Sequence, residues 1–297
     1  MRALLTGVTG QVGAALLRRL GSNAVIATDR SVMDLSSPDR IARALDKLRP
    51  NLIINPAAYT AVDHAEEERD LAFTVNAEAP GAIARWAAMH EVPFIHFSTD
   101  YIFDGSGDTP RKEDAEPRPL NVYGASKLAG ERAVRAAGGT HLIVRTSWVY
   151  AAGGTNFLRT IARLARERNE LRIVADQIGA PTSAACIADG VAHIVGHRET
   201  LSARFAAADG VVHFAATGQA SWFEFASAIV AGLRHRKVPL ALNALIPIRS
   251  SEYPTKAARP LNSRLALTKL DDVFGFRPPS WTMCLEPELD TLAQEMR

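Results

Sequence analysis

Three glycines at three-residue intervals, Gly7, Gly10 and Gly13, stand at the start of the chain and constrain its fold more than any other feature. They lie between an apolar segment at residues 4–6 and the helical sequence 14–20, an order that predicts a strand, a tight turn and a helix. Such a turn lets the backbone approach a pyrophosphate, and the free N–H groups of the helix N-terminus bind phosphate oxygens. The spacing differs from Gly-x-Gly-x-x-Gly, and a glycine turn alone can be only a turn.

The sequence after the turn favours the dinucleotide interpretation. An apolar strand at residues 24–28 ends on Asp29, at about the distance downstream where an acidic side chain reaches an adenosine ribose. Apolar segments at 51–55, 92–97 and 141–146 alternate with helical sequence, including a long stretch at about 63–89. This alternation predicts an α/β fold with a Rossmann-type, doubly wound parallel sheet.

The second half of the chain has a different pattern. Helices are predicted at about 156–168, 184–196, 221–233 and after Trp281, strands at 171–174 and 211–214, and a long loop at 249–263. We expect residues 1–150 to form an NAD(P)-binding domain. Residues 151–297 are expected to form mainly a smaller substrate-binding domain, interleaved with the last strands of the main sheet.

Tyr123 and Lys127 lie four residues apart at the start of a predicted helix, so their side chains share one face. A neighbouring ammonium favours a phenolate and is expected to lower the tyrosine pKa toward the range of a general acid or base. Thr99 ends the strand at 92–97, and ligands of open α/β sheets bind beyond the carboxyl ends of the strands. Thr99 is therefore expected to face the same crevice as the glycine turn.

Composition limits the other possibilities. The 34 basic and 32 acidic residues nearly balance, so nothing predicts a nucleic-acid or membrane partner. Two cysteines cannot form a disulfide framework, and no apolar run is long enough to span a bilayer, which favours a cytoplasmic protein. The eight histidines have no paired metal-ligand spacing, and no metal site is predicted.

Six stretches in order resemble the extended short-chain dehydrogenase/reductases, and within them the reductases of dTDP-4-dehydro sugars. They are 7–13, 98–105, 121–131, 145–150, 176–182 and 259–263. The resemblance implies reduction by NAD(P)H of the 4-keto group of dTDP-4-dehydro-6-deoxy-L-mannose to dTDP-L-rhamnose, for cell-surface polysaccharide synthesis. It also implies that Tyr123 donates the proton, Lys127 holds the ribose and lowers the tyrosine pKa, and Thr99 orients the keto oxygen.

The resemblance extends to binding residues. The cofactor contacts that it implies come from Gly7, Gly10, Gln11, Val12, Gly13, Asp29, Arg30, Asp34, Leu35, Ala58, Tyr59, Thr60, Tyr123 and Lys127. The substrate contacts that it implies come from Thr99, Asp100, Trp148, Asp176, Gln177 and Arg259. Asp29 favours the free 2′-hydroxyl of NADH and Arg30 the 2′-phosphate of NADPH; family grounds favour NADPH slightly.

Alternatives stay open for several residues. Trp148 is also explained as a core aromatic, Asp176 and Gln177 as turn stabilisers, and Arg259 as a solvated loop cation. A homodimer is compatible with the resemblance. Ala14 and Ala15, however, stand where some relatives carry an acid that binds magnesium between subunits, so a metal bridge is not expected.

Two other functions compete with the reductase. A sugar-nucleotide epimerase or dehydratase shares the scaffold, but the dehydratases carry Thr-Asp-Glu where this chain has Tyr101 after Asp100. A non-catalytic binding subunit that kept the fold is the other alternative, and intact Thr99, Tyr123 and Lys127 argue against it.

Overall fold

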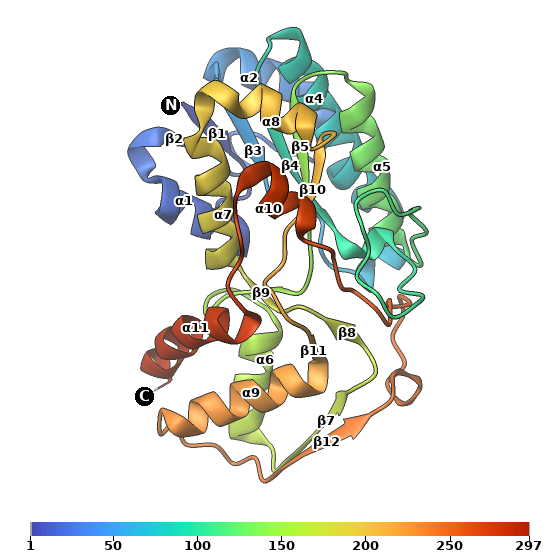
Figure 1. The fold of residues 1–297 in the computed structure, drawn as a ribbon, viewed down its shortest axis with the longest axis vertical. Helices are drawn as coiled ribbons and strands as arrows, with labels where there is room; N and C mark the ends of the chain where they lie inside the picture. Colours follow the sequence, from blue (N-terminus) through green and yellow to red (C-terminus); the bar gives the residue numbers. More distant parts are fainter. Residues whose placement is uncertain (1, 297) are drawn as a thin grey trace.

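A six-stranded parallel sheet forms the centre of the molecule in the computed structural model, which describes residues 2–296 (Figure 1). The strand order is β2-β1-β3-β4-β5-β10, and every neighbouring pair is parallel. The strands are β1 (Ala3–Leu5), β2 (Val25–Ala27), β3 (Leu52–Asn55), β4 (Phe94–Thr99), β5 (His141–Thr146) and β10 (Val211–His213). The order reverses between β1 and β3, which confirms the predicted doubly wound, Rossmann-type sheet.

Helices cover both faces of this sheet (Figure 1). Side chains of successive strand residues point to opposite faces, so Leu5 packs in the cluster containing α1 and α7 residues, whereas Leu4 packs with α2 and α4. Both leucines are fully buried, as the continuous apolar strands predict. The covering helices are α1 (Gln11–Leu20), α7 (Ala184–Gly196), α8 (Leu201–Ala207) and α10 (Thr268–Phe274) on one side, and α2 (Ile41–Leu48), α4 (Ala79–Met89) and α5 (Val122–Ala136) on the other.

The long helical stretch predicted at about 63–89 is present from Arg69 onward, but it is not one regular helix. The chain forms a 3-10 turn, His64–Glu66, then α3 (Arg69–Phe73), a π-helical turn at Thr74–Glu78, and α4. The π-helical turn holds the buried Asn76, whose side chain binds the backbone of Tyr59 and the hydroxyl of Ser126. These long-range hydrogen bonds override the regular helical hydrogen bonding that the local sequence favours.

A smaller lobe lies below the sheet in Figure 1, with its own apolar cluster. Its helices are α6 (Phe157–Glu167), α9 (Trp222–His235) and α11 (Trp281–Glu295), each capped by the preceding Asn or Ser side chain. Its strands β7 (Glu170–Val174) and β12 (Ala244–Ile248) pair in parallel, and β8 (Ile178–Gly179) pairs with β11 (Ala220–Ser221). No strand was predicted from the sequence at the position of β12.

The chain passes between the two lobes several times. After β5 it runs through β6 (Val149–Tyr150) and α6, and it returns through β9 (Thr182–Ser183), which pairs with β6, into α7 and β10. It then builds α9 and β12 before α10 packs on the large lobe. No helix among residues 2–296 is long and apolar enough to cross a membrane.

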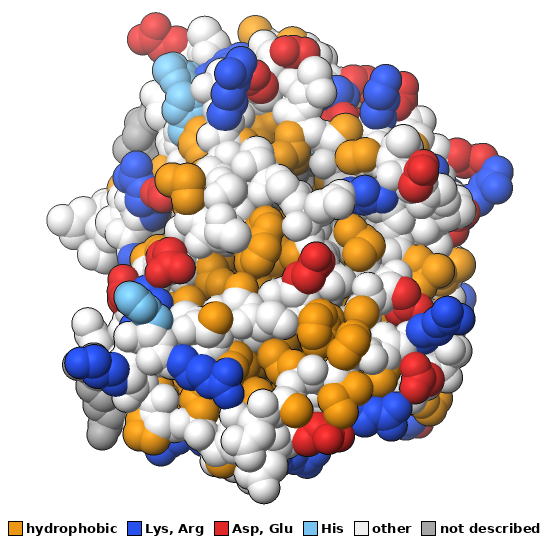
Figure 2. Space-filling view, turned by 60° about the horizontal axis from the view of Figure 1, so that its bottom comes forward, with side chains coloured by type: hydrophobic (Ala, Val, Ile, Leu, Met, Phe, Trp, Pro, Cys, Tyr) orange, Lys and Arg blue, Asp and Glu red, His pale blue; other side chains and the backbone are white. Residues whose placement is uncertain are grey.

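Charges of both signs are scattered over the face seen in Figure 2, while hydrophobic side chains gather toward its middle. This face shows no extended region of one charge, in keeping with the near-zero net charge of the whole chain.

Candidate active site

A cavity of about 700 Å³ lies beyond the carboxyl ends of β1, β3 and β4, within the size range of small-molecule sites, roughly 300–1,000 Å³. It is where the reversal in strand order predicts a ligand crevice. The predicted residues that line it are Gly7, Gly10, Gln11, Val12, Gly13, Asp29, Arg30, Asp34, Leu35, Ala58, Tyr59, Thr60, Thr99, Asp100, Tyr123, Lys127 and Trp148. The fold therefore brings together segments separated by more than a hundred residues.

Two of the three glycines in the turn, Gly7 and Gly13, have no room for a larger residue. Gly7 has a φ of +59°, and a Cβ at this position would lie 2.9 Å from the Ala57 Cα. A Cβ on Gly13 would lie 2.0 Å from the Gly7 carbonyl oxygen. Helix α1 begins after Gly10 with no side-chain cap, so its first N–H groups are free to bind phosphate. These observations fit a dinucleotide pyrophosphate.

Two carboxylates, those of Asp29 and Asp34, also line the cavity. Asp29 accepts hydrogen bonds from the backbone N–H and hydroxyl of Ser31, and these bonds lower its pKa. Asp34 accepts a bond from the Ser36 N–H, which lowers the Asp34 pKa. Both groups are therefore ionised at neutral pH. Leu35 beside them is buried and offers an apolar surface.

The segment after β3 forms another wall. The Tyr59 backbone makes two hydrogen bonds with the Asn76 amide, at 2.8 and 3.0 Å. The Tyr59 hydroxyl binds the Glu68 carboxylate, and this bond raises the tyrosine pKa to about 12. Because Asn76 also binds Ser126 on α5 at 2.9 Å, it links this wall to the helix that carries Tyr123 and Lys127.

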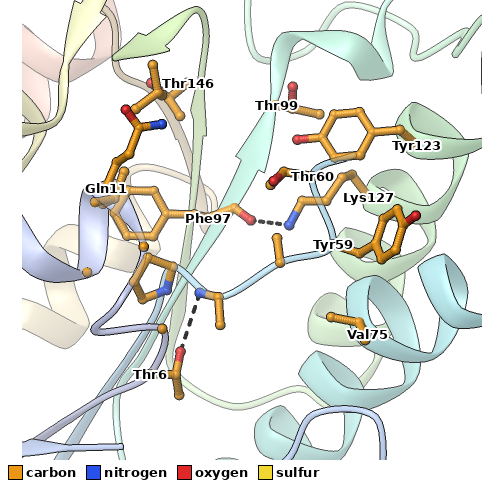
Figure 3. Close-up of a pocket in the computed structure, with 18 of the residues that line it drawn as sticks. Thr6, Gln11, Tyr59, Thr60, Val75, Phe97, Thr99, Tyr123, Lys127 and Thr146 are labelled. Carbon is orange, nitrogen blue, oxygen red and sulfur yellow. Dashed lines mark hydrogen bonds between the residues drawn. The ribbon is translucent and has the colours of Figure 1, made fainter. Parts of the chain in front are cut away.

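Tyr123 and Lys127 point into the same space from the first two turns of α5, which is capped by Asn121 (Figure 3). Lys127 is 2 % exposed, and its ammonium donates a 2.6 Å hydrogen bond to the Phe97 carbonyl oxygen. Burial lowers the Lys127 pKa to about 8, against a smaller opposing effect of Glu131. Burial likewise raises the Tyr123 pKa to about 12, while a hydrogen bond with Thr99 lowers it.

The expectation that Lys127 lowers the tyrosine pKa is wrong for this structure. The ammonium binds a backbone carbonyl and is not among the groups that shift the pKa of Tyr123. Tyr123 is consequently a neutral phenol at physiological pH, which is the form that a proton donor needs.

The end of β4 contributes three further groups. The Thr99 hydroxyl accepts a bond from the Tyr101 N–H at 3.2 Å, and the Tyr101 ring packs edge-on against Tyr123 with centroids 5.6 Å apart. Asp100 is buried, which raises its pKa to about 6. The Asp100 Oδ2 atom has no hydrogen-bond partner among the described residues and is therefore available for a ligand donor.

Three predicted substrate residues lie away from the cavity wall. Asp176 accepts bonds from the N–H and hydroxyl of Ser250, the arrangement expected of a loop stabiliser. Gln177 bridges Ser250 and the indole N–H of Trp222. Arg259 forms two hydrogen bonds with the Asp63 carboxylate, at 2.7 and 3.0 Å, so the solvated-cation alternative is wrong.

The small lobe supplies cavity residues that the sequence analysis missed. Trp222 and Phe157 line the cavity, and the Trp222 ring stacks on Trp148 with centroids 3.6 Å apart. Asn156 lines it too and donates a 2.8 Å hydrogen bond to Gln11 of the glycine turn. Only the helix-start signals at Asn156 and Ser221 mark this region, and they do not indicate a site. Within residues 2–296 no group of three or more His, Cys, Asp or Glu side chains is arranged to hold a metal ion.

Comparison with known proteins places this geometry in a family. The chain matches the family described as RmlD substrate binding domain over residues 1–294. It is 46 % identical over 284 residues to dTDP-4-dehydrorhamnose reductase from Burkholderia thailandensis, covering 95 % of each chain. It is 43 % identical to the enzyme of the same name from Escherichia coli K12, covering 98 % of each chain.

Solved structures agree with this result. The crystal structure of dTDP-4-dehydrorhamnose reductase from Bacillus anthracis in complex with NADP has a TM-score of 0.88 at 34 % identity, and the match covers 97 % of this chain and 98 % of that one. UDP-glucose 4-epimerase from Thermus thermophilus, at 18 % identity, covers 98 % of this chain and 99 % of its own, with a TM-score of 0.79, and shares the fold. Because the family match spans nearly the whole sequence, the chain belongs to the RmlD substrate-binding-domain family, that of the dTDP-4-dehydrorhamnose reductases.

Proposed function

We propose that this protein is an NADPH-dependent dTDP-4-dehydrorhamnose reductase. It reduces the 4-keto group of dTDP-4-dehydro-6-deoxy-L-mannose to the hydroxyl of dTDP-L-rhamnose, a precursor for cell-surface polysaccharide. The observation that carries the proposal is the meeting of Tyr123, Lys127 and Thr99 in one cavity with the glycine turn. Relatives of that name, 46 % and 43 % identical over nearly the full chain, support it.

The residues present fit a dinucleotide. Gly7, Gly10 and Gly13, with the α1 N-terminus, would hold the pyrophosphate, since Gly7 and Gly13 leave no room for a Cβ and the backbone can approach a ligand closely. Asp29 and Arg30 would lie at the adenosine ribose, Asp34 and Leu35 at the adenine, and 58–60 along the cofactor. When bound, NADPH supplies the hydride that reduces the carbonyl carbon.

Side chains of α5 and β4 provide the proton that the reduction of the keto group requires. Tyr123 carries its hydroxyl proton at working pH and donates it to the oxygen that becomes the alcohol. Lys127, held by the Phe97 carbonyl, sets a positive charge beside the site and binds the ribose. Thr99 orients the keto oxygen through its hydroxyl, which already contacts Tyr123.

Asp100 and Trp148 are proposed to contact the sugar nucleotide. The free Oδ2 of the buried Asp100 supports this role, since a sugar hydroxyl could donate to it. Direct substrate contact by Asp176, Gln177 and Arg259 remains a prediction, because each of them binds protein groups here. A domain division at about residue 150, cytoplasmic location and a homodimer remain predictions as well.

One experiment separates the reductase from its rivals. Purified protein is mixed with dTDP-4-dehydrorhamnose and NADPH, or NADH in a parallel sample, and the loss of reduced-nicotinamide absorbance is followed. We expect stoichiometric loss and formation of dTDP-L-rhamnose. An epimerase would interconvert sugar nucleotides with no net cofactor consumption, and a binding subunit would show neither reaction.

A further inference from the structure

Both faces of the Trp148 indole are covered by protein. On one face the Trp222 ring lies parallel, with a centroid separation of 3.6 Å and an angle of 7°. Against the other side lies the backbone of Gly179, where a Cβ would come within 2.5 Å of Cε2 and 2.8 Å of Nε1. Trp148 nevertheless lines the cavity, so it can offer a ligand only its ring edge.

The covering ring is itself held on two sides by the small lobe. Phe157 packs against Trp222 with centroids 4.5 Å apart, tilted by 45°. The Trp222 Nε1–H donates a 3.1 Å hydrogen bond to the Gln177 side-chain oxygen, and the Gln177 amide donates a 3.1 Å bond to the Ser250 hydroxyl. That hydroxyl donates a 2.6 Å bond to Asp176.

The stacked pair joins the two lobes. Trp148 lies two residues after the end of β5, a strand of the large lobe. Its φ of +48° is a left-handed backbone conformation that a bulky residue rarely adopts. Trp222 is the first residue of α9 and is fixed there by the capping box of Ser221 and Glu224. Surrounding contacts must hold the strained Trp148 backbone, and the stack with Trp222 is one of them.

We propose that Trp222 is a positioning residue for the sugar-nucleotide site. It fixes Trp148 so that the edge of that indole, and not its face, meets the substrate. The inference rests on the proposed function, because it assigns a support to a substrate residue of that same site. It also gives Gln177 and Asp176 a role through Trp222 that requires no direct contact with the substrate.

The stack can be measured without any turnover. Two stacked indoles couple their electronic transitions, and they give an exciton couplet in the far-ultraviolet circular dichroism spectrum when the two transition moments are rotated relative to each other within the stack. We expect the couplet in the wild-type protein, and we expect Trp222→Phe and Trp148→Phe each to abolish it. Trp281→Phe is the matched control: Trp281 packs on Phe225 in the small lobe, does not line the cavity, and should leave the couplet unchanged.

Kinetics then test the positioning role. Trp222→Leu should raise the KM for dTDP-4-dehydrorhamnose roughly five- to tenfold, the range expected for losing one aromatic pair. The kcat should stay within about twofold and the KM for NADPH should not change, because the lost interaction acts equally on bound substrate and transition state. Trp222→Phe, which keeps a flat ring, should restore most of the affinity. Trp281→Phe should behave as wild type.

Two results would overturn the inference. One is a Trp222→Phe spectrum that differs from the wild-type spectrum no more than the spectrum of Trp281→Phe does. The other is a Trp222→Leu protein with a wild-type KM for the sugar nucleotide; if that variant does not fold, a wild-type KM in Trp222→Met, which also lacks a flat ring, overturns the inference equally. If the wild type does not oxidise NADPH, the proposed function fails instead, and calorimetric binding of dTDP-L-rhamnose to the same variants still tests Trp222.

Discussion

The ammonium nitrogen of Lys127 lies 2.6 Å from the carbonyl oxygen of Phe97, which ties helix α5 to strand β4 two residues before Thr99. The sheet therefore fixes the position of this charge in the absence of any ligand. The Lys127 side chain is buried, and no carboxylate within residues 2–296 forms an ion pair with it, so its charge destabilises the fold and is available to the site.

Replacing Tyr123 with phenylalanine should remove turnover while leaving the cofactor site intact. The change deletes the hydroxyl that donates the proton, and such a group contributes typically 10²–10⁴-fold. We expect a loss of about that size in kcat, with NADPH affinity, measured by fluorescence titration, within about twofold of wild type. An unchanged kcat would remove Tyr123 from the proposed mechanism.

Replacing Lys127 with methionine should inactivate the enzyme and stabilise the fold at neutral pH. Burial lowers the Lys127 pKa from 10.5 to about 8, so between these values the unfolded chain binds the proton more tightly. The cost of the buried charge is thus fully present below pH ~8 and vanishes as the pH rises to ~10.5. At 1.36 kcal/mol per pKa unit, the variant should gain up to about 3 kcal/mol at pH 7.

Urea unfolding of both proteins at several pH values checks this prediction. The stability difference between Lys127→Met and wild type should shrink steadily from pH 8 to 10, since titration of other groups cancels in the comparison. A difference independent of pH would show that the lysine is not buried as a charge.

Alanine at Gly13 should disrupt the glycine turn. Its Cβ would lie 2.0 Å from the Gly7 carbonyl oxygen, a contact that only a backbone shift relieves. Overpacking of this kind costs about 1–3 kcal/mol, and the shift should lower NADPH affinity at least tenfold. Gly196→Ala is the control, because Gly196 also lies in a helix and, apart from its chain neighbours and the backbone of its own helix, no atom of the described side chains or backbone lies within 4 Å of the position that an added methyl would take. That variant should bind NADPH normally and be slightly more stable.

The ion pair of Arg259 and Asp63 joins residues 196 positions apart, and a double-mutant cycle should measure its strength. We expect a coupling of about 1 kcal/mol at pH 7 from Arg259→Ala and Asp63→Ala, a modest value because the Asp63 side chain is 39 % exposed and screened by solvent. The Arg259 guanidinium lowers the Asp63 pKa to about 2. The coupling is therefore present above pH ~4 and is lost as the pH falls toward 2.

Arg259→Ala, compared with Asp63→Asn and the wild type, also tests whether Arg259 contacts the substrate. If it binds the diphosphate, Arg259→Ala should raise the KM for the sugar nucleotide, whereas Asp63→Asn, which leaves the guanidinium in place, should not. Equal KM values in all three proteins would limit Arg259 to its structural role.

Local patterns in the sequence predict much of this molecule. The glycine turn, the continuous apolar strands and the helix at Ala184–Gly196 are encoded by neighbouring residues, and the structure has them where they were expected. The sequence also predicts that Thr99 and Tyr123 lie in one crevice, because parallel strands place their carboxyl ends at one edge of the sheet.

The features that were missed depend on contacts between distant segments. The π-helical turn at Asn76 exists because this side chain binds Tyr59 and Ser126, and nothing beside Asn76 in the sequence signals those partners. The stack of Trp148 and Trp222 has the same character. The Tyr123 pKa was predicted in the wrong direction, because spacing along a helix shows neither burial nor that Lys127 binds a carbonyl.

Strand β10 comes after helix α6 and strand β7 of the small lobe in the chain, yet it completes the large sheet beside β5. A fragment ending at residue 150 would consequently leave β5 as a bare edge, with a row of unpaired backbone groups ready to recruit strands from other molecules. Neither half should be obtainable as an independent soluble unit. During synthesis, the sheet of the cofactor-binding half cannot be completed until the residues of β10 have been made.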